Sequence, residues 1–447
     1  MHETPNRARL PDRRTVWRWH FYAGVLCAPV VIVLAASGSV YLFKSELESW
    51  IDSGIDARAA SDLPVRPPSA QVAAAVAALP GGTLKAYELP QAAGATRVLV
   101  SAAGGDERIY VHPGTLEILG RVAERDRLMR RVFRLHGELW LGEYGSFLVE
   151  LAASWTVVLI LTGLWLWWPR AARGGGVLWP RLAAGGRTAW RDLHAVTGFW
   201  VAGLALVLLA SGLPWSRSWG SYLKLVRRLT GTTAATQDWN SGGERRGGEH
   251  AGHGGSRRRG RGDGGRPLTA ADLARLDTVC AAVAELPLDP PVLVAPQPEG
   301  PNWSVKSETA NRPRRVELVV AGDSGRIESR RDFSDRHLID RIVGYGIAFH
   351  EGRLFGWPNQ LLGLCAASGL VLVAVSGWVM WWRRRPPGVL GAPPGPASGR
   401  PAWPLVVVIV AIGMWLPMFG TSLVAVLGIE RLVLRRSPGV RSWLGLP

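Results

Sequence analysis

Four histidines occupy positions at which they could bind a metal-containing cofactor. Two of them, His20 and His194, lie in apolar segments, and each is followed four residues later by a glycine, Gly24 or Gly198. Imidazole is a common ligand of transition metals and of haem iron. A single histidine near a helix end is more often an interfacial residue, but an ionisable side chain within a membrane span is by default a functional candidate.

His20 and His194 belong to an internal repeat, which becomes visible when the two histidines are aligned at an offset of 174 residues. A matching pattern at both ends of an apolar segment indicates duplicated helices. The further positions that agree are Gly24 with Gly198, Ser37 with Ser211, and Gly38 with Gly212.

His136 and His350 belong to a second repeated segment, aligned without a gap at an offset of 214 residues. The further positions that agree or are similar are Arg127 with Arg341, Gly142 with Gly356, Ser154 with Ser368, Thr162-Gly163 with Ser376-Gly377, and Trp167-Trp168 with Trp381-Trp382. The chain is therefore interpreted as two halves, each a helix, a polar block and a second helix. Parallel repeats of this kind are related by an axis along the membrane normal.

This repeat predicts two histidine pairs, His20 with His194 near one membrane face and His136 with His350 near the other. Two facing imidazoles in a helical bundle favour haem, whose iron takes axial ligands from both faces of the ring. Zinc is disfavoured, because it usually takes four tetrahedral ligands and neither a cysteine nor a carboxylate recurs at the repeat offsets. Gly24 and Gly198 would leave room beside the flat macrocycle.

Three charged residues near these histidines have open interpretations. Arg127 and Arg341 precede the outer histidines by nine residues and could neutralise haem propionates, although a solvated charge is about equally expected. Glu150 lies in an apolar segment without an acidic counterpart, so it is either a polar site or an interfacial residue.

Long apolar segments predict a membrane protein with four or five transmembrane helices. About 20 apolar residues are needed to cross the hydrocarbon core. The expected spans are 19–43, 147–168, 197–215 and 361–382, followed by a fifth from 403 to 429. Pro417 should kink or break the fifth span, and a break would return the basic tail to the side from which the span started.

Charge predicts the orientation of these spans. The net charge is +17, and many arginines lie in the N-terminal tail and in the short loops after the second and fourth spans. Basic short loops are typically cytoplasmic, so the two long polar blocks should lie on the other side. The same placement disfavours nucleic-acid binding, which needs a basic face on a soluble fold. Cys27, Cys280 and Cys365 show no paired spacing, so neither a disulfide framework nor a thiolate site is indicated.

The polar blocks each predict a small α+β domain. Helix-like stretches at 69–79 and 269–286 precede alternating strands at 97–101, 108–111, 303–307 and 315–320. Residues 240–266 are a Gly- and Arg-rich linker that includes His250 and His253, for which solvation is favoured over metal binding. The expected units are 1–43 (tail and first span), 44–135 (first outer domain), 136–215 (outer histidine segment, second span, cytoplasmic loop and third span), 216–345 (second outer domain with the linker), 346–385 (outer histidine segment and fourth span) and 386–447 (cytoplasmic loop, fifth span and basic tail).

Several motifs resemble the PepSY-associated transmembrane family. They are W-x-W-H-x3-G at 17–24, L-H-x3-G at 193–198, H-G-E-L-W-L-G at 136–142 and P-M-F-G-T-S-L at 417–423. The polar blocks resemble PepSY domains, with 111–119 and 320–327 as closing hairpin segments. The resemblance implies a pseudo-twofold helical bundle in a bacterial inner membrane, with the N-terminus cytoplasmic and two PepSY-like domains periplasmic.

The same resemblance implies two b-type haems with His20, His194, His136 and His350 as axial ligands. It implies electron transfer to an iron(III) chelate or siderophore, and no G-x-G-x-x-G dinucleotide motif follows a predicted strand. The electron donor would therefore be a separate partner, either quinol or a flavoprotein. Two other hypotheses stay open: a non-catalytic peptide-binding or regulatory membrane protein, and a transporter of haem or a metal complex.

Overall fold

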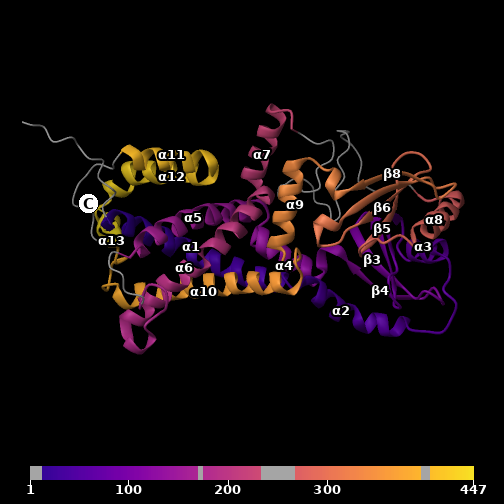
Figure 1. Ribbon diagram of the computed structural model, residues 1–447, viewed down its shortest axis with the longest axis horizontal. Coiled ribbons are helices and arrows are strands. Elements are labelled where there is room, and N and C mark those ends of the chain that lie inside the picture. The colour runs from indigo at the N-terminus through magenta and orange to yellow at the C-terminus, as the bar shows by residue number, and fades with distance from the viewer. Residues whose placement is uncertain (1–12, 170–174, 233–266, 394–402, 447) are drawn as a thin grey trace, which may run out of the picture.

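A bundle of four long helices forms the body of the molecule, and a β-sheet lies at one end of it (Figure 1). The computed structural model describes residues 13–169, 175–232, 267–393 and 403–446. Helices α1 and α6 each pack against both α5 and α10, so the four helices close a ring. Their bounds are α1 (Arg13–Tyr41), α5 (Glu143–Trp167), α6 (Gly186–Gly212) and α10 (Trp357–Arg384).

Five helices in the described part of the chain are long and apolar enough to cross a membrane. They are the four bundle helices, with α6 continued by the short helix η3 (Leu213–Trp215), and the segment Pro417–Arg436. The predicted four or five transmembrane helices are thus confirmed, and the chain is a membrane protein. We call the bundle end that carries Arg13, Arg187 and Arg384 the arginine end, and the opposite end the sheet end.

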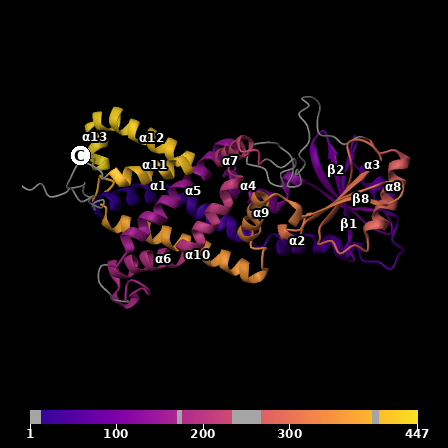
Figure 2. The same ribbon diagram turned by 45° about the horizontal axis from the view of Figure 1, so that its top comes forward.

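The predicted fifth span is broken into a helical hairpin. Helix α11 (Trp403–Trp415) ends one residue before Leu416, and α12 (Pro417–Leu432) starts with the proline. Proline has no amide hydrogen for the preceding turn, so it is tolerated at a helix start but interrupts a continuous helix. The two helices lie side by side along the flank of the bundle in Figures 1 and 2, and α12 packs against α5.

The hairpin returns the chain to the arginine end. The short helix α13 (Pro438–Leu444) follows, and the Arg18 guanidinium of α1 donates hydrogen bonds to the carbonyl oxygens of Pro393 at 3.0 Å and Gly445 at 2.5 Å. The hydroxyl of Tyr22 donates to the Leu444 carbonyl at 2.6 Å. Both described termini therefore lie at the arginine end, which agrees with the hairpin alternative rather than with a full fifth crossing.

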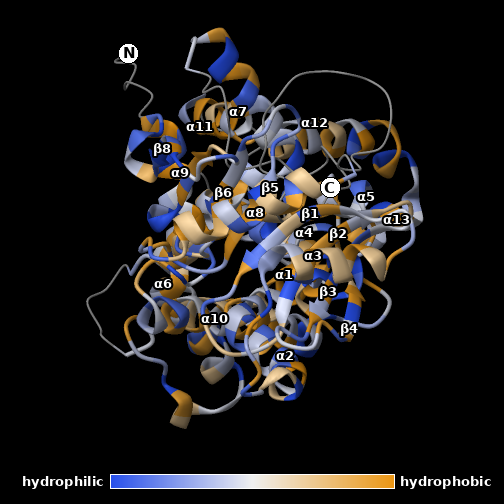
Figure 3. Cartoon of the chain, turned by 90° about the vertical axis from the view of Figure 1, so that its right-hand side faces the viewer, coloured by the Kyte–Doolittle hydropathy of each residue, from blue (hydrophilic) through white to orange (hydrophobic). Residues whose placement is uncertain are grey.

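The two polar blocks contribute strands to a single antiparallel sheet of eight strands. Its order is β4-β3-β2-β1-β5-β6-β7-β8, and the central β1–β5 pair, with Tyr87 opposite Val294, joins the strands of the first block to those of the second (Figure 3). The strand bounds are β1 (Thr83–Leu89), β2 (Thr96–Ala102), β3 (Gly105–Val111), β4 (Ile118–Ala123), β5 (Val292–Pro296), β6 (Trp303–Ser307), β7 (Val316–Val320) and β8 (Ile327–Asp332).

Helices α3 (Pro68–Ala77) and α8 (Ala270–Val283) pack against each other and share one core with the sheet. Alternate strand residues such as Val98 and Val305 are fully buried in this core, as the period-two pattern requires. The predicted helices at 69–79 and 269–286 and the four predicted strands are confirmed within a few residues. Strands β1, β4, β5 and β8 complete the sheet.

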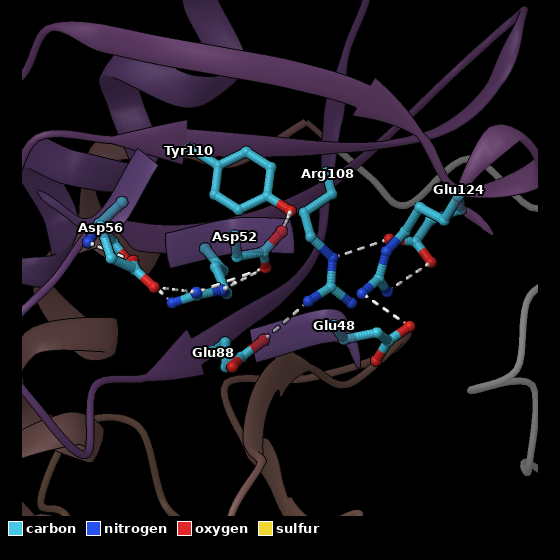
Figure 4. Close-up of polar contacts among 10 residues, drawn as sticks. Glu48, Asp52, Asp56, Glu88, Arg108, Tyr110 and Glu124 are labelled. Carbon is cyan, nitrogen blue, oxygen red and sulfur yellow. Dashed lines mark hydrogen bonds and ion pairs between the residues drawn. The ribbon is translucent and has the colours of Figure 1, made fainter. Parts of the chain in front are cut away.

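Helix α2 (Lys44–Ala59), which the sequence analysis did not predict, is attached to the sheet by ion pairs (Figure 4). The hydroxyl of Tyr110 donates to Asp52 at 3.0 Å, and the Arg97 guanidinium donates to Asp56 at 2.8 Å. These carboxylates project from α2 toward strand residues, and Ile55 and Ala59 of the same helix pack in a small apolar cluster with Tyr110 and Leu119. The helix is therefore held by both charge and apolar contacts.

Two short helices at the sheet end carry the outer histidines into the bundle. These are α4 (Leu128–Glu138), which packs on α1 and α5, and α9 (Leu338–His350), which packs on α6. Helix α7 (Arg217–Leu229) is fixed to α9 by a buried ion pair, in which the Arg227 guanidinium donates to Asp340 at 2.6 Å. The predicted linker 240–266, with His250 and His253, lies outside the described residues.

Candidate functional site: two pairs of histidines

The first histidine pair lies near the arginine end of the bundle. His20 is on α1 and His194 is on α6, and their ring centroids are 6.2 Å apart with the ring planes at 89°. The two helices do not follow each other in the chain, so the pair exists only because the ring of four helices closes. The predicted proximity of these two residues is confirmed.

The second pair lies at the sheet end and repeats the first in its dimensions. His136 of α4 and His350 of α9 have ring centroids 6.2 Å apart, with the ring planes at 74°. The predicted proximity of His136 to His350 is confirmed as well. Two imidazole pairs of equal separation therefore lie at opposite ends of one helical bundle.

A backbone carbonyl oxygen fixes the tautomer of the imidazoles. Nδ1 of His194 lies 2.9 Å from the Val373 carbonyl oxygen, Nδ1 of His136 lies 3.0 Å from that of Leu34, and Nδ1 of His350 lies 2.9 Å from that of Leu208. A carbonyl oxygen can only accept, so Nδ1 must carry the hydrogen. The lone pair of each of these rings is then on Nε2, where it can bind a metal.

A hydroxyl from a neighbouring helix contacts Nδ1 of every one of the four histidines. Thr162 Oγ1 lies 2.9 Å from Nδ1 of His20 and itself donates to the Val158 carbonyl at 2.7 Å. With its own hydrogen engaged, the hydroxyl oxygen accepts the Nδ1 hydrogen of His20. The equivalent contacts are Ser376 with His194 at 3.3 Å, Ser37 with His136 at 3.2 Å, and Ser211 with His350 at 3.2 Å.

A glycine directly follows each of these hydroxyl residues, and the histidine ring lies against it. A Cβ atom added to Gly163 would lie 3.2 Å from Cε1 of His20, and one added to Gly38 would lie 3.1 Å from Cε1 of His136. The corresponding distances for Gly377 with His194 and Gly212 with His350 are 3.3 and 3.4 Å. Such contacts are tighter than most side chains accept, so glycine gives each ring its space.

A large cavity of about 1430 Å³ surrounds the pair at the arginine end. His20, His194, Gly24 and Gly198 all line it. A Cβ atom added to Gly24 or Gly198 would meet its nearest neighbour at 3.8 Å, so neither glycine is required by protein packing alone. Their effect is to widen the cavity beside the two imidazoles.

The two arginines proposed to neutralise propionates have different surroundings. Arg127 forms ion pairs with Glu48 at 3.0 Å and Glu124 at 3.5 Å, so carboxylates of the protein already balance its charge. Arg341 lines a smaller cavity of about 360 Å³ beside the sheet, and its buried Nε atom has no hydrogen-bond partner among the described residues. A role of either residue toward a cofactor stays a prediction.

Glu150 has a structural explanation. Its carboxylate accepts hydrogen bonds from the amides of Ser218 at 2.8 Å and Trp219 at 2.9 Å, in the first turn of α7. The first amides of a helix have no partner within the helix, and a carboxylate satisfies them well. Glu150, which lies on α5, therefore joins this helix to the first turn of α7.

The described cysteines are free: Cys27 and Cys280 are buried and Cys365 is exposed. Within the described ranges, no three His, Cys, Asp or Glu side chains form a group able to hold a metal ion. Each candidate centre thus offers two imidazoles as ligands. The sequence repeat contained the hydroxyl–glycine dipeptides but not their role, because that role depends on which helices become neighbours.

The fold and site together define a membrane protein with a closed helical bundle and a histidine pair near each end. The chain matches the family described as PepSY-associated TM region over residues 17–384 and therefore belongs to it. This stretch runs from the start of α1 to the end of α10 and includes all four histidines. No curated protein sequence is significantly similar to the chain.

Proposed function

We propose that the chain carries electrons across a bacterial inner membrane through two b-type haems and reduces an iron(III) chelate, such as a ferric siderophore, in the periplasm. His20 and His194 would hold the inner haem, and His136 and His350 the outer one. The observation that carries the proposal is the 6.2 Å separation of ring centroids in both pairs.

This separation fits two axial ligands of a single metal ion. A metal–imidazole bond is about 2 Å long and a ring nitrogen lies roughly 1 Å from its ring centroid, so two axial imidazoles place their centroids roughly 6 Å apart. The cavity of about 1430 Å³ at the inner pair, widened at Gly24 and Gly198, supports a cofactor of macrocycle size there.

The protein residues would orient the ligands and fill the axial positions. The carbonyl and hydroxyl contacts to Nδ1 hold each ring and leave Nε2 for the iron. A haem iron with both axial positions filled exchanges single electrons without offering a site for oxygen. Because iron(III) binds hard oxygen chelators far more tightly than iron(II) does, reduction would release iron from the chelate.

The arrangement of charge supports an orientation with the arginine end in the cytoplasm. Arginines concentrate at that end, in accordance with the positive-inside tendency. The sheet end would then face the periplasm, with the two polar blocks acting as PepSY-like domains. Electrons would enter beside His20 and His194 and leave beside His136 and His350.

Optical spectra of the purified protein test the proposal. We expect a bis-histidine haem spectrum that is reduced by dithionite and reoxidised by a ferric siderophore. The absence of bound haem after expression with haem supplied would contradict the proposal and favour a regulatory protein. Haem that exchanges freely across vesicle membranes would instead favour a transporter.

A further inference from the structure

The charged side chains that line the large cavity are almost all positive. Seven arginines line it, with no aspartate or glutamate among the described lining residues. Two of them, Arg181 and Arg191, pair with the buried Asp192 at 2.7 and 2.6 Å. The remaining five form what we call the arginine ring: Arg13, Arg14, Arg187, Arg383 and Arg384.

Two members of the arginine ring, Arg13 and Arg187, lie at the same distance along their helices from the inner histidines. Arg13 precedes His20 by seven residues, and Arg187 precedes His194 by seven. At 1.5 Å of rise per residue, seven residues of helix place the arginines about 10 Å nearer the arginine end than the imidazoles. The ring therefore surrounds the mouth of the cavity rather than its floor.

The arginine ring is accessible from outside the protein. All five residues are exposed, and the hydrogen bond and ring contacts described for Arg13 and Arg384 are with neutral groups. Arg13 donates to the Leu166 carbonyl at 2.7 Å, and the Arg384 guanidinium lies 5.1 Å from the centroid of the Trp17 ring. Neither contact neutralises a charge, so the mouth presents a positive field to an approaching partner.

We infer that the arginine ring is the docking surface for an acidic electron-carrier protein, one bearing a reduced flavin or an iron–sulfur cluster. This inference rests on the proposed function. Electron-transfer encounters are small and transient, and charge complementarity steers them. In each encounter the carrier would lose one electron, and an iron(III) centre held by His20 and His194 would take up this electron.

The position of the ring favours a protein over the other anions that could meet it. Two haem propionates could neutralise two of the five charges and would leave the others exposed. Lipid headgroups contact the outside of a bundle, whereas these arginines line the mouth of its cavity. A protein with an acidic patch can cover the whole mouth at once.

The test is direct binding of an oxidised acidic [2Fe–2S] ferredoxin to the haem-loaded protein in zwitterionic nanodiscs. We expect the affinity to fall with increasing salt, and to fall at least about tenfold in the double variant Arg14→Gln, Arg187→Gln. The matched control is Arg436→Gln, Arg441→Gln, which removes two exposed charges at the same end but outside the cavity. This control should bind within about twofold of the unaltered protein.

An equal loss of binding in both double variants would overturn the inference, because net charge alone would then explain it. Suppression of ferredoxin binding by phosphatidylglycerol nanodiscs would assign the ring to lipid headgroups instead. Rapid reduction by a quinol, unchanged in the Arg14→Gln, Arg187→Gln variant and faster than by reduced ferredoxin, would assign the donor role to quinol. Failure of the proposed function would give a different result from failure of this inference, because dithionite would then produce no haem reduction at all.

Discussion

Thr162 accepts the Nδ1 hydrogen of His20 at 2.9 Å while its own hydroxyl hydrogen is bound to Val158. An acceptor on Nδ1 raises the basicity of the ligating nitrogen. We therefore expect Thr162→Val to raise the midpoint potential of the proposed inner haem and to weaken the retention of this haem by about 10- to 100-fold. Redox titration and the rate of haem transfer to apomyoglobin measure the two effects.

Two variants in the same helix make this prediction specific. Thr162→Ser keeps the hydroxyl and should restore the potential. Thr156→Val removes a buried hydroxyl that donates to the Ala152 carbonyl and lines the same cavity without contacting a histidine. A potential that shifts equally in the Thr156 and Thr162 variants would contradict the positioning role.

Single histidine substitutions should distinguish the two proposed haems. His136→Ala removes one ligand of the outer pair and leaves the inner pair intact, so the haem content should fall from two per chain to one. His20→Ala should have the reciprocal effect. Pyridine haemochrome assays give the stoichiometry, and retention of both haems in both variants would refute the assignment.

The glycines beside the imidazoles should tolerate substitution poorly. In Gly38→Ala the new methyl group would lie 3.1 Å from Cε1 of His136, so the ring must move. We expect a broadened or shifted outer-haem spectrum with an unaltered inner haem. Gly203→Ala in α6 is the control, since a Cβ atom there meets no described neighbour within 4 Å and should even stabilise the helix by about 1 kcal/mol. Identical spectra for the two variants would argue against the ring contact.

The α11–α12 hairpin should be separable from the haem sites. A Cβ atom on Gly420 would lie 2.7 Å from the carbonyl oxygen of Gly413, which cannot move without separating the two helices. We expect Gly420→Val to lower the stability in detergent by about 1–3 kcal/mol, the usual effect of overpacking. Gly428→Val has open space and should have little effect. Haem content should be normal in both, because the histidines lie on α1, α4, α6 and α9, outside the hairpin.

An ion pair between the two halves should make stability sensitive to acid. The Arg353 guanidinium donates to Glu46 at 2.6 Å, and this hydrogen bond lowers the pKa of the Glu46 carboxyl from 4.5 to about 2. A lowered folded-state pKa stabilises the protein above pH 4.5, and the contribution is lost as the pH falls from 4.5 to about 2. The melting temperature of Glu46→Gln should lie below that of the unaltered protein at neutral pH, and the gap should close over this window.

The exposed carboxylate Glu117 provides the control for this titration. Glu117→Gln should follow the pH profile of the unaltered protein. A gap between Glu46→Gln and the unaltered protein that stays constant down to pH 2 would contradict the ion-pair explanation. Because most of the Glu46 side chain is open to solvent, the effect should also decrease with salt.

The spans and the histidine pairs could be predicted from the sequence because both depend on local or repeated patterns. Apolar length alone predicts a transmembrane helix, and the two offsets matched His20 to His194 and His136 to His350. Pro417 predicted the interruption of the fifth span. The direction of the chain after that break could not be read, because it depends on the tertiary contacts of Arg18 and Tyr22 with the C-terminal segment.

Other features depend on contacts between distant segments. Helix α2 has a sequence of mixed charge with exposed Trp50 and Ile51, and it is held by contacts of its polar and apolar side chains with distant strands. The pairing of β1 with β5 joins residues about 200 positions apart in the sequence. The sequence of a strand does not show with which distant strand it pairs. For the same reason the contact of Thr162 with His20 was not predicted, although Thr162-Gly163 was recognised as part of the repeat.

The pairing of β1 with β5 also restricts how the two repeats of the chain can move relative to each other. Transporters that alternate access rock one repeat against the other around a central site. Here such rocking would tear a row of backbone hydrogen bonds at the centre of a continuous sheet, where Tyr87, Glu88 and Leu89 face Val294, Leu293 and Val292. The continuous sheet therefore opposes such rocking, and this would suit the proposed electron transfer, because electrons would cross the membrane without the opening of a gate.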